Sequence, residues 1–296
     1  MTDSSPPGHN RPFPYNRLEG FLAQPGLDDA MRASVHGAVA YYDTAPTLHR
    51  DVKDVGRFML GVLALYLDAS GGLTHRRLRE LSGKSGIVSA GTATAVLLRL
   101  QMIGYVTRAE ASNGHSRPYK PTAAMEAAFR DRMRIEFEAL THITREVDQI
   151  LTRFDEPEVF AMLMAMMGDQ AMQAAGSPNP DIEAFNKLAV RSAGLLILFD
   201  LMRRADTGGA FPPVGEVQVS VAAIARHYDV SRSHALSVLR DIERAGWIDK
   251  RPGDGVWFLT QALRDDIRTF YGITYLGLIR AAEMAFEQLA AETVAS

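Results

Sequence analysis

The sequence predicts a mainly α protein with small β-hairpin wings. Residues 235–245 carry apolar side chains at helical spacing, a pattern that indicates one buried helix face. Two β-rich runs, 247–251 and 256–260, follow and enclose Pro-Gly-Asp-Gly, a composition typical of a hairpin turn. The same order of elements occurs earlier, in residues 51–122. We therefore expect two similar modules in one chain, joined by long helices.

The second module, residues 187–260, contains the best-defined elements. Its apolar spacing predicts two short helices separated by a turn at residues 227–229. Ser231 precedes the second helix, where a hydroxyl caps free backbone N–H groups, and Gly246 follows it, where a left-handed residue ends a helix without strain. Helix, turn, helix and hairpin together form the plan of a winged helix-turn-helix.

Residues 230–248, with the sequence VSRSHALSVLRDIERAGWI, and the closing run VWFLT at 256–260 resemble winged-helix repressors, in particular the MarR and GntR groups. In such families the second helix of the motif enters the major groove of DNA. The resemblance therefore implies a DNA-binding regulator, and the flanking helices resemble the dimerisation helices of the MarR group. Because winged helices also serve as protein-docking modules, the resemblance bears more directly on fold than on function.

The first module, residues 51–122, is predicted from an internal repeat. Aligning residues 104–106 with 246–248 brings two sets of apolar positions into register: Ala93, Val96, Leu97, Leu100 and Ile103 match Ala235, Val238, Leu239, Ile242 and Ala245. The match needs additional residues in the turn near 84–87, and the hairpin tip at 112–116 is longer. Since apolar spacing often agrees by chance, the repeat depends on the shared order of elements. The predicted fold is thus a tandem of winged helix-turn-helix modules joined by long helices.

The rest of the chain divides into a tail and three helical segments. Residues 1–16 contain four Pro and no apolar core, so they are expected to form a flexible tail. The N-terminal helical segment, the connector and the C-terminal helical segment are expected over 17–50, 123–186 and 261–296.

Finer expectations concern individual helices. We predict one helix over 123–154 capped by Thr122, a single helix over 187–205 that opens the second module, and a C-terminal helix over 261–293, with a break near Gly272 as the alternative to a continuous helix. A cluster of methionines in residues 162–172 is interpreted as helical core, with an adaptable interface or a ligand pocket as the alternative.

Composition limits the class of protein. The 296 residues are 47% hydrophobic and 23% charged, suffice for two ordinary domains, and hold no apolar run long enough to cross a bilayer. The absence of cysteine excludes disulfides and thiolate metal sites and fits a cytoplasmic location. The net charge is −3, yet residues 57–122 carry nine Lys/Arg against three Asp/Glu, and residues 187–264 carry eleven against eight. Basic modules on an acidic scaffold are expected of a DNA-binding protein, because the attraction of DNA phosphates acts only near the docking face. The alternative is that these are solvent-exposed helices whose charges differ by chance.

In the second module, the side of the helix opposite its apolar stripe is expected to face DNA. The expected contacts there and on the wing are Arg232, Ser233, His234, Ser237, Arg240, Arg244, Lys250 and Arg251. Arg232 or Arg240 suits guanine O6 and N7, and Leu236 suits a thymine methyl group. The wing cations suit phosphates, which fix position without reading sequence. For each residue alone, a solvated surface charge is the alternative.

The first module offers a different surface. Its expected contacts are Arg76, Arg77, Arg79, Thr92, Thr94, Arg108, Arg117 and Lys120. The alignment exposes an uncharged face on its second helix, formed by Gly91, Thr94, Ala95, Leu98 and Met102. Either this helix reads DNA shape and methyl groups while nearby cations hold phosphates, or it docks a protein partner. We favour DNA, because a docking module has no need of the basic run 75–79 and a basic wing.

The sequence therefore predicts a transcription regulator that binds specific DNA through two modules with different groove helices, at an asymmetric pair of half-sites. The implied partners are double-stranded DNA, a small-molecule effector suggested by the resemblance, and a second copy of the chain bound through the terminal helices, with no membrane partner. Two alternatives remain: a structural protein that docks a partner, resembling tandem winged-helix condensin accessory subunits, and a plasmid-type replication initiator, which is expected to be more basic.

Enzyme signatures are not found in the sequence. The chain has no GxSxG, no HExxH and no phosphate-binding glycine loop, and the Gly-Lys-Ser in residues 83–85 lacks the earlier glycine. The eight histidines form no short-spaced pair suited to zinc. We therefore expect no catalytic residue, no cofactor and no metal.

Overall fold

The computed structural model describes most of the chain, over residues 15–44, 53–85, 89–109, 118–174, 182–253 and 255–295. Several expectations fall outside these ranges: the first fourteen residues of the predicted tail, the first hairpin tip, part of the turn near residues 84–87, and Arg117. Tyr15 and Asn16, which were assigned to the tail, instead belong to a short 3-10 helix, Tyr15–Arg17.

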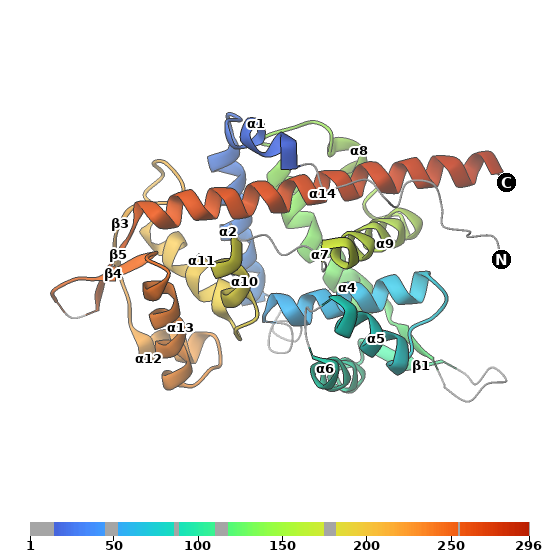
Figure 1. Cartoon of the computed structure of the whole chain (residues 1–296), viewed down its shortest axis with the longest axis horizontal. Coiled ribbons are helices and arrows are strands. Elements are labelled where there is room, and N and C mark those ends of the chain that lie inside the picture. The colour runs from blue at the N-terminus through green and yellow to red at the C-terminus, as the bar shows by residue number, and fades with distance from the viewer. Residues whose placement is uncertain are drawn as a thin grey trace.

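The described residues form a mainly helical protein with two small antiparallel sheets (Figure 1). The helices are α1 (Leu18–Leu22), α2 (Leu27–Thr44), α4 (Val55–Ala69), α5 (His75–Ser85), α6 (Ala90–Met102), α7 (Ala123–Leu140), α8 (Asp148–Thr152), α9 (Pro157–Ala174), α10 (Glu183–Ala189), α11 (Gly194–Ala205), α12 (Val221–His227), α13 (Arg232–Arg244) and α14 (Gln261–Ala295). The strands are β1 (Val106–Arg108), β2 (Tyr119–Pro121), β3 (Gly215–Gln218), β4 (Ile248–Lys250) and β5 (Val256–Leu259).

The first helix–hairpin unit runs from α4 to β2. Asp54 caps α4 by accepting a hydrogen bond from the Arg57 N–H at 2.9 Å, and two glycines with positive φ, Gly71 and Gly72, end the turn after it. Helices α5 and α6 follow, and β1 pairs antiparallel with β2. Leu73 makes an isolated bridge to Tyr119, so the segment between α4 and α5 joins the hairpin.

The second helix–hairpin unit runs from α11 to β5 and repeats this order. Strand β3 lies between α11 and α12, and the sheet order is β3-β5-β4 with both pairings antiparallel. Ser231 caps α13 by accepting a hydrogen bond from the His234 N–H at 3.0 Å. Gly246, with φ 75°, ends α13, as its position in the sequence indicates.

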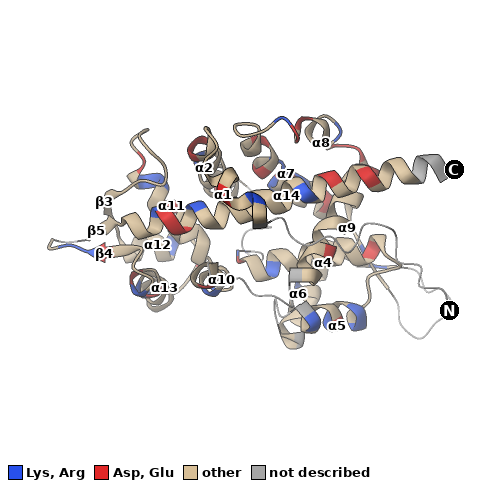
Figure 2. Cartoon of the chain, turned by 45° about the horizontal axis from the view of Figure 1, so that its top comes forward, with Lys and Arg blue, Asp and Glu red and all other residues tan. Residues whose placement is uncertain are grey.

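The remaining helices hold the two units in one body. Helix α14 extends along most of the molecule and packs on α9, while α2 packs on both α7 and α11 (Figure 1). Helix α13 and the α5–α6 pair lie on the same side of α14 in the views of Figures 1 and 2. The scaffold thus places the two helix–hairpin units with their second helices toward one side.

Two predicted helices are wrong, the alternative of a break at Gly272 does not occur, and one strand is additional to those expected. The predicted helix over 187–205 is two helices, because Ala193 adopts a left-handed conformation at φ 57° before α11. The predicted helix over 123–154 ends at Leu140 and is followed by the short α8. Helix α14 continues through Gly272, whose missing side chain leaves room for Leu18 and Leu22 of α1. Strand β3 was not predicted.

Candidate nucleic-acid interface

The candidate interface centres on the solvent face of α13. Ala235, Val238, Leu239 and Ile242 are buried and fix which way the helix faces. Four of the predicted contacts are exposed on the opposite side: Arg232, Ser233, Arg240 and Arg244. Leu236 lies among them, half-buried. This face therefore presents three guanidinium groups and a hydroxyl, all rigidly spaced by one capped helix.

Two predicted contacts on α13 face a neighbouring helix instead. His234 Nε2 lies 2.9 Å from the carbonyl oxygen of Ser192, and Ser237 Oγ accepts a hydrogen bond from Arg191 at 2.9 Å. Both side chains are half-buried, because the segment between α10 and α11 passes beside this stripe of α13. His234 and Ser237 thus anchor α13 to this segment, and their contact with DNA stays a prediction.

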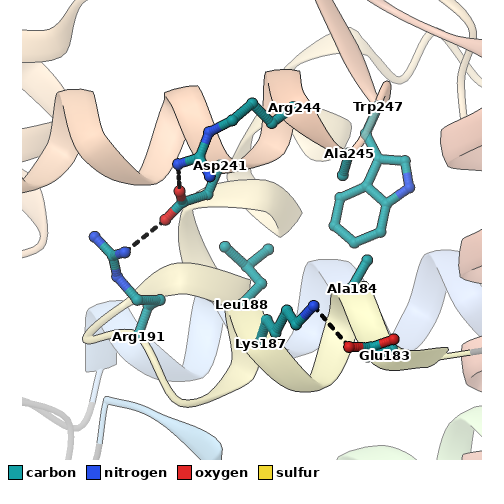
Figure 3. A pocket seen from close by; sticks show the side chains of 9 residues that line it. All are labelled: Glu183, Ala184, Lys187, Leu188, Arg191, Asp241, Arg244, Ala245 and Trp247. Carbon is teal, nitrogen blue, oxygen red and sulfur yellow. Dashed lines mark hydrogen bonds and ion pairs between the residues drawn. The ribbon is translucent and has the colours of Figure 1, made fainter. Parts of the chain in front are cut away.

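An open cleft of about 530 Å³ lies between α10 and α13 (Figure 3). Asp241 sits across it from Arg191, with Arg191 Nη1 and Asp241 Oδ2 2.6 Å apart, and it also pairs with Arg244. On the other side, Lys187 Nζ pairs with Glu183 at 2.6 Å. Lys187 and Arg191 thus add two cations beside α13. The sequence predicted one continuous helix over 187–205, and that prediction did not place these two cations beside α13.

Trp247 closes one end of this cleft and ties α13 to the scaffold. Its ring stacks on Phe185 of α10 with centroids 4.2 Å apart, and its Nε1–H donates to Asp266 of α14 at 2.8 Å. The side chain is fully buried, so its polar atom has the partner that burial demands. The orientation of α13 relative to α14 is therefore set by an aromatic contact and a charge-assisted hydrogen bond.

The hairpin after α13 carries two of the predicted cations at its tip. Lys250 and Arg251 are exposed, and the Arg251 guanidinium lies over the Phe258 ring at 4.6 Å from its centroid. Figure 2 shows blue residues running out along this hairpin. Strand β4 follows α13 closely in the chain and pairs with β5, so the cationic tip belongs to the hairpin that directly follows that helix.

The basic helix α5 of the first unit divides between free and structural arginines. Arg79 is exposed, and Arg76 is exposed while it pairs with Glu80, with Nε and Oε1 3.0 Å apart. Arg77 is half-buried, and it donates to the carbonyl oxygens of Gly72 at 2.7 Å and Ser70 at 2.9 Å. Arg77 therefore satisfies carbonyl oxygens after the end of α4, and its contact with DNA stays a prediction.

Helix α6 presents the largely apolar face that the repeat predicts. Met102 is 77% exposed and Leu98 is 47% exposed, which places both among the few large apolar side chains open to solvent in the described residues. The same face also holds the exposed Arg99, a cation that the predicted surface lacked. Of the two predicted threonines, Thr94 is within hydrogen-bond distance of His75 at 2.9 Å.

The other predicted threonine and the first hairpin complete this side of the molecule. Thr92 closes the N-terminus of α6, since its N–H donates to Ser89 at 3.1 Å. On the hairpin, Lys120 and Arg108 are exposed. The Arg108 guanidinium lies over the Tyr119 ring and donates to its hydroxyl at 3.2 Å. The surface thus combines an apolar helix with a cationic border.

Charge is distributed unevenly over the body. Figure 2 shows Lys and Arg on α5 and on the β4–β5 hairpin, while Asp and Glu gather on the C-terminal half of α14 and near α8. This distribution agrees with the excess of Lys and Arg over Asp and Glu in residues 57–122 and 187–264. A polyanion would therefore be attracted to the side of the helix–hairpin units and repelled from the C-terminal half of α14.

The described residues hold no group of three or more His, Asp or Glu side chains arranged to bind a metal ion. None of the described helices is long and apolar enough to span a membrane. Comparison with protein-family models, curated proteins and solved structures finds no match for this chain.

Proposed function

We propose that this protein is a transcription regulator that binds specific double-stranded DNA through two winged helix-turn-helix modules. In this proposal α11 to β5 form one module and α4 to β2 form the other. Each has a first helix, an extended segment that pairs with the hairpin, two further helices and the hairpin itself, which is the order of a winged helix. The groove helices are α13 and α6, and the wings are the two hairpins.

The exposed face of α13 is the observation that carries the proposal. Arg232 and Arg240 are both exposed there, and neither forms an ion pair with another described residue. Free guanidinium groups spaced along a rigid helix suit bidentate hydrogen bonds to guanine O6 and N7. Leu236 between them suits the methyl group of thymine. Charged residues that serve only solubility do not need an apolar side chain between two guanidinium groups on one helix face.

The cations beside α13 have a different role in the proposal. Lys250 and Arg251 at the hairpin tip, and Lys187 across the cleft, contact phosphates on either side of the groove. Phosphate contacts supply affinity and register but carry no sequence information. The module then separates the two tasks: the face of α13 selects bases, and its flanks hold the backbone.

The two modules read different sequences in this proposal. The solvent face of α13 bears guanidinium groups, whereas that of α6 bears Leu98 and Met102. A chain with two unlike groove helices recognises an asymmetric pair of half-sites, because a palindrome requires two equal readers. At the α6 half-site, apolar contacts favour thymine methyl groups and DNA shape.

The proposal is tested by the fluorescence anisotropy of a labelled duplex, titrated with the protein, that carries the site this protein selects from a random DNA library. The double variant Arg232→Ala/Arg240→Ala is expected to lose about tenfold or more in affinity, since each contact contributes on the order of 1 kcal/mol or more. Arg145→Ala is the matched control, because Arg145 is 85% exposed but lies on α8's side of the molecule. Equal affinity for the duplex in the wild type and the double variant would refute the proposed role of α13.

A second candidate function concerns the first unit alone. The exposure of Met102 and Leu98 on α6 also suits a protein-docking surface, because exposed apolar patches commonly mark protein-interaction sites. In that case the Arg76→Ala/Arg79→Ala variant keeps the wild-type DNA affinity and its salt dependence. If the first unit binds DNA, the same variant weakens binding and lowers the slope of log affinity against log salt by about 1.8.

A further inference from the structure

A mostly apolar cavity of about 330 Å³, open to solvent on one side, lies between the helices of the body. Its walls come from α2, α4, α7, α9, α11 and α14, and include aromatic rings such as Phe58, Phe199 and Phe270. This volume falls within the range of natural small-molecule sites. At about 30 Å³ for each water molecule, it holds roughly eleven waters, or a ligand of about a dozen non-hydrogen atoms.

The cavity lies where the two helix–hairpin units meet. Val55 and Phe58 line it from α4 of the first unit, and Leu195 and Phe199 line it from α11 of the second. Thr274 lines it from α14, the helix that spans both units. A molecule bound in the cavity therefore contacts both units at once.

Lys53 connects the same two units at the border of the cavity. Its Nζ donates to the carbonyl oxygens of Tyr228 at 3.2 Å and Asp229 at 2.8 Å, at the end of α12. Its own carbonyl oxygen accepts a hydrogen bond from the Ala193 N–H at 3.0 Å, directly before α11. Because Lys53 also lines the cavity, a ligand that shifts it moves the contact on which the turn before α13 rests.

The polar part of the cavity wall favours an acceptor group on the ligand. Arg132 pairs with Glu136, with Nη2 and Oε1 2.7 Å apart, and its Nη1 has no hydrogen-bond acceptor among the described residues. A buried donor without an acceptor costs roughly 1–3 kcal/mol. Both Glu136 oxygens are already engaged, one by Arg132 and the other by the Ser34 hydroxyl at 2.6 Å. The second carboxylate of the wall, Asp54, is engaged as well, by the Arg57 N–H at 2.9 Å and by Arg57 Nε at 3.3 Å. Neither carboxylate accepts from Arg132 Nη1, which is left without an acceptor among the described residues.

We infer that this cavity binds a small monocarboxylate with an apolar body, and that its binding sets the relative placement of the two units. The apolar body lies among the aromatic and aliphatic side chains, and the carboxylate pairs with the Arg132 guanidinium, which lines the cavity and has no acceptor for Nη1 among the described residues. Guanidinium and carboxylate match in charge and in geometry, which an ammonium ligand does not. The regulatory half of this inference rests on the proposed function, because the two units are then the two DNA-binding modules.

Calorimetric titration of the full chain without DNA tests the binding site. The probes are 2-naphthoate and decanoate, each about a dozen non-hydrogen atoms, with 2-naphthylmethylamine as the matched cation. We expect one carboxylate bound for each chain and affinity for the amine lower by about tenfold or more. Failure of both carboxylates to bind, or equal binding of the amine, overturns the inference.

Two variants locate the site. Thr274→Trp fills the cavity from α14, so carboxylate binding is expected to vanish while the unfolding temperature stays close to that of the wild type. Arg132→Met/Glu136→Gln removes the buried charges together, a replacement that proteins tolerate. It is expected to abolish the preference for naphthoate over the amine. Naphthoate binding that survives Thr274→Trp, or a preference that survives the double variant, overturns the assignment.

The regulatory half has its own measurement. DNA affinity is measured by anisotropy with and without saturating naphthoate, and a change of about threefold or more is expected. An unchanged affinity of a DNA-binding protein overturns the coupling but leaves the site. Naphthoate binding by a protein with no DNA affinity at all refutes the proposed function and leaves the binding site intact.

Discussion

Replacement of Glu136 by Gln tests the buried polar network that joins α2, α7 and α14. The Glu136 carboxylate accepts hydrogen bonds from Arg132 at 2.7 Å and from Ser34 at 2.6 Å, and the Ser34 hydroxyl lies 2.7 Å from that of Tyr275. Burial first, and the nearby Glu136 charge second, raise the pKa of Tyr275 well above its usual value. The tyrosine therefore keeps its proton and can donate to Ser34.

The magnitude follows from the charge that Gln cannot replace. Removing one partner of a buried ion pair costs about 3–5 kcal/mol, and we take the lower end because the Arg132 side chain is 23% exposed. The entropy of unfolding is about 2.1 cal/mol/K for each residue, or about 0.6 kcal/mol/K for this chain. A loss of about 3 kcal/mol therefore lowers the unfolding temperature by about 5 °C.

Thermal unfolding followed by circular dichroism measures this change. Glu138→Gln is the matched control, since Glu138 lies on the same helix but is exposed, and it is expected to leave the unfolding temperature within about 1 °C. A Glu136→Gln protein that unfolds within about 1 °C of the wild type would show that the buried ion pair contributes no net stability.

Three further predictions follow from packing, capping and surface charge. Gly61→Ala is expected to destabilise the fold by about 1–3 kcal/mol, because the new methyl group overlaps the Phe129 ring. Gly83 has open space around it, so Gly83→Ala is expected to gain up to about 1 kcal/mol of stability from helix propensity. Chemical denaturation of the two variants measures both changes. Burial raises the pKa of the Asp54 carboxyl above its usual 3.8, although the N–H and the guanidinium of Arg57 act to lower it. The protonated carboxyl therefore contributes stability to the fold below pH 3.8, and this contribution is lost as the pH rises through the raised pKa. Asp54→Asn, which keeps the cap, is therefore expected to gain stability relative to the wild type as pH rises from 3.8, and a difference independent of pH would contradict this. Lys250→Ala/Arg251→Ala is expected to lower the slope of log affinity against log salt by about 1.8, and an unchanged slope would remove the hairpin from the interface.

Local signals in the sequence predicted much of the second unit. The Ser231 cap, the Gly246 terminator and the buried stripe of α13 each depend on residues within one helix length, and all three are confirmed. Exposure of Arg232 and Arg240 follows from the same stripe, because fixing the buried face of a helix also fixes its open face.

Features that depend on distant partners were not predictable. Strand β3 has only four residues and acquires its extended form by pairing with β5, some forty positions later. The left-handed Ala193 has no glycine to signal it; the structure holds it through hydrogen bonds such as that to the Lys53 carbonyl. Helical periodicity alone cannot detect either constraint.

The candidate site shows the same division. Arg77 resembles its neighbours in the basic run, and only the fold places it against the end of α4. His234 and Ser237 lie on the polar side of α13, yet α10 and its following segment cover that stripe. Lys187 and Arg191 enter the interface for the same reason, since α10 brings them beside α13.

Selection of bound duplexes from a random DNA library by the full chain tests the central claim most directly. The account predicts enrichment of one asymmetric site made of two unlike halves, and loss of selectivity at one half in the Arg240→Ala variant. A selected pool that stays random, or an identical site selected by the wild type and Arg240→Ala, would contradict the claim that α13 reads DNA.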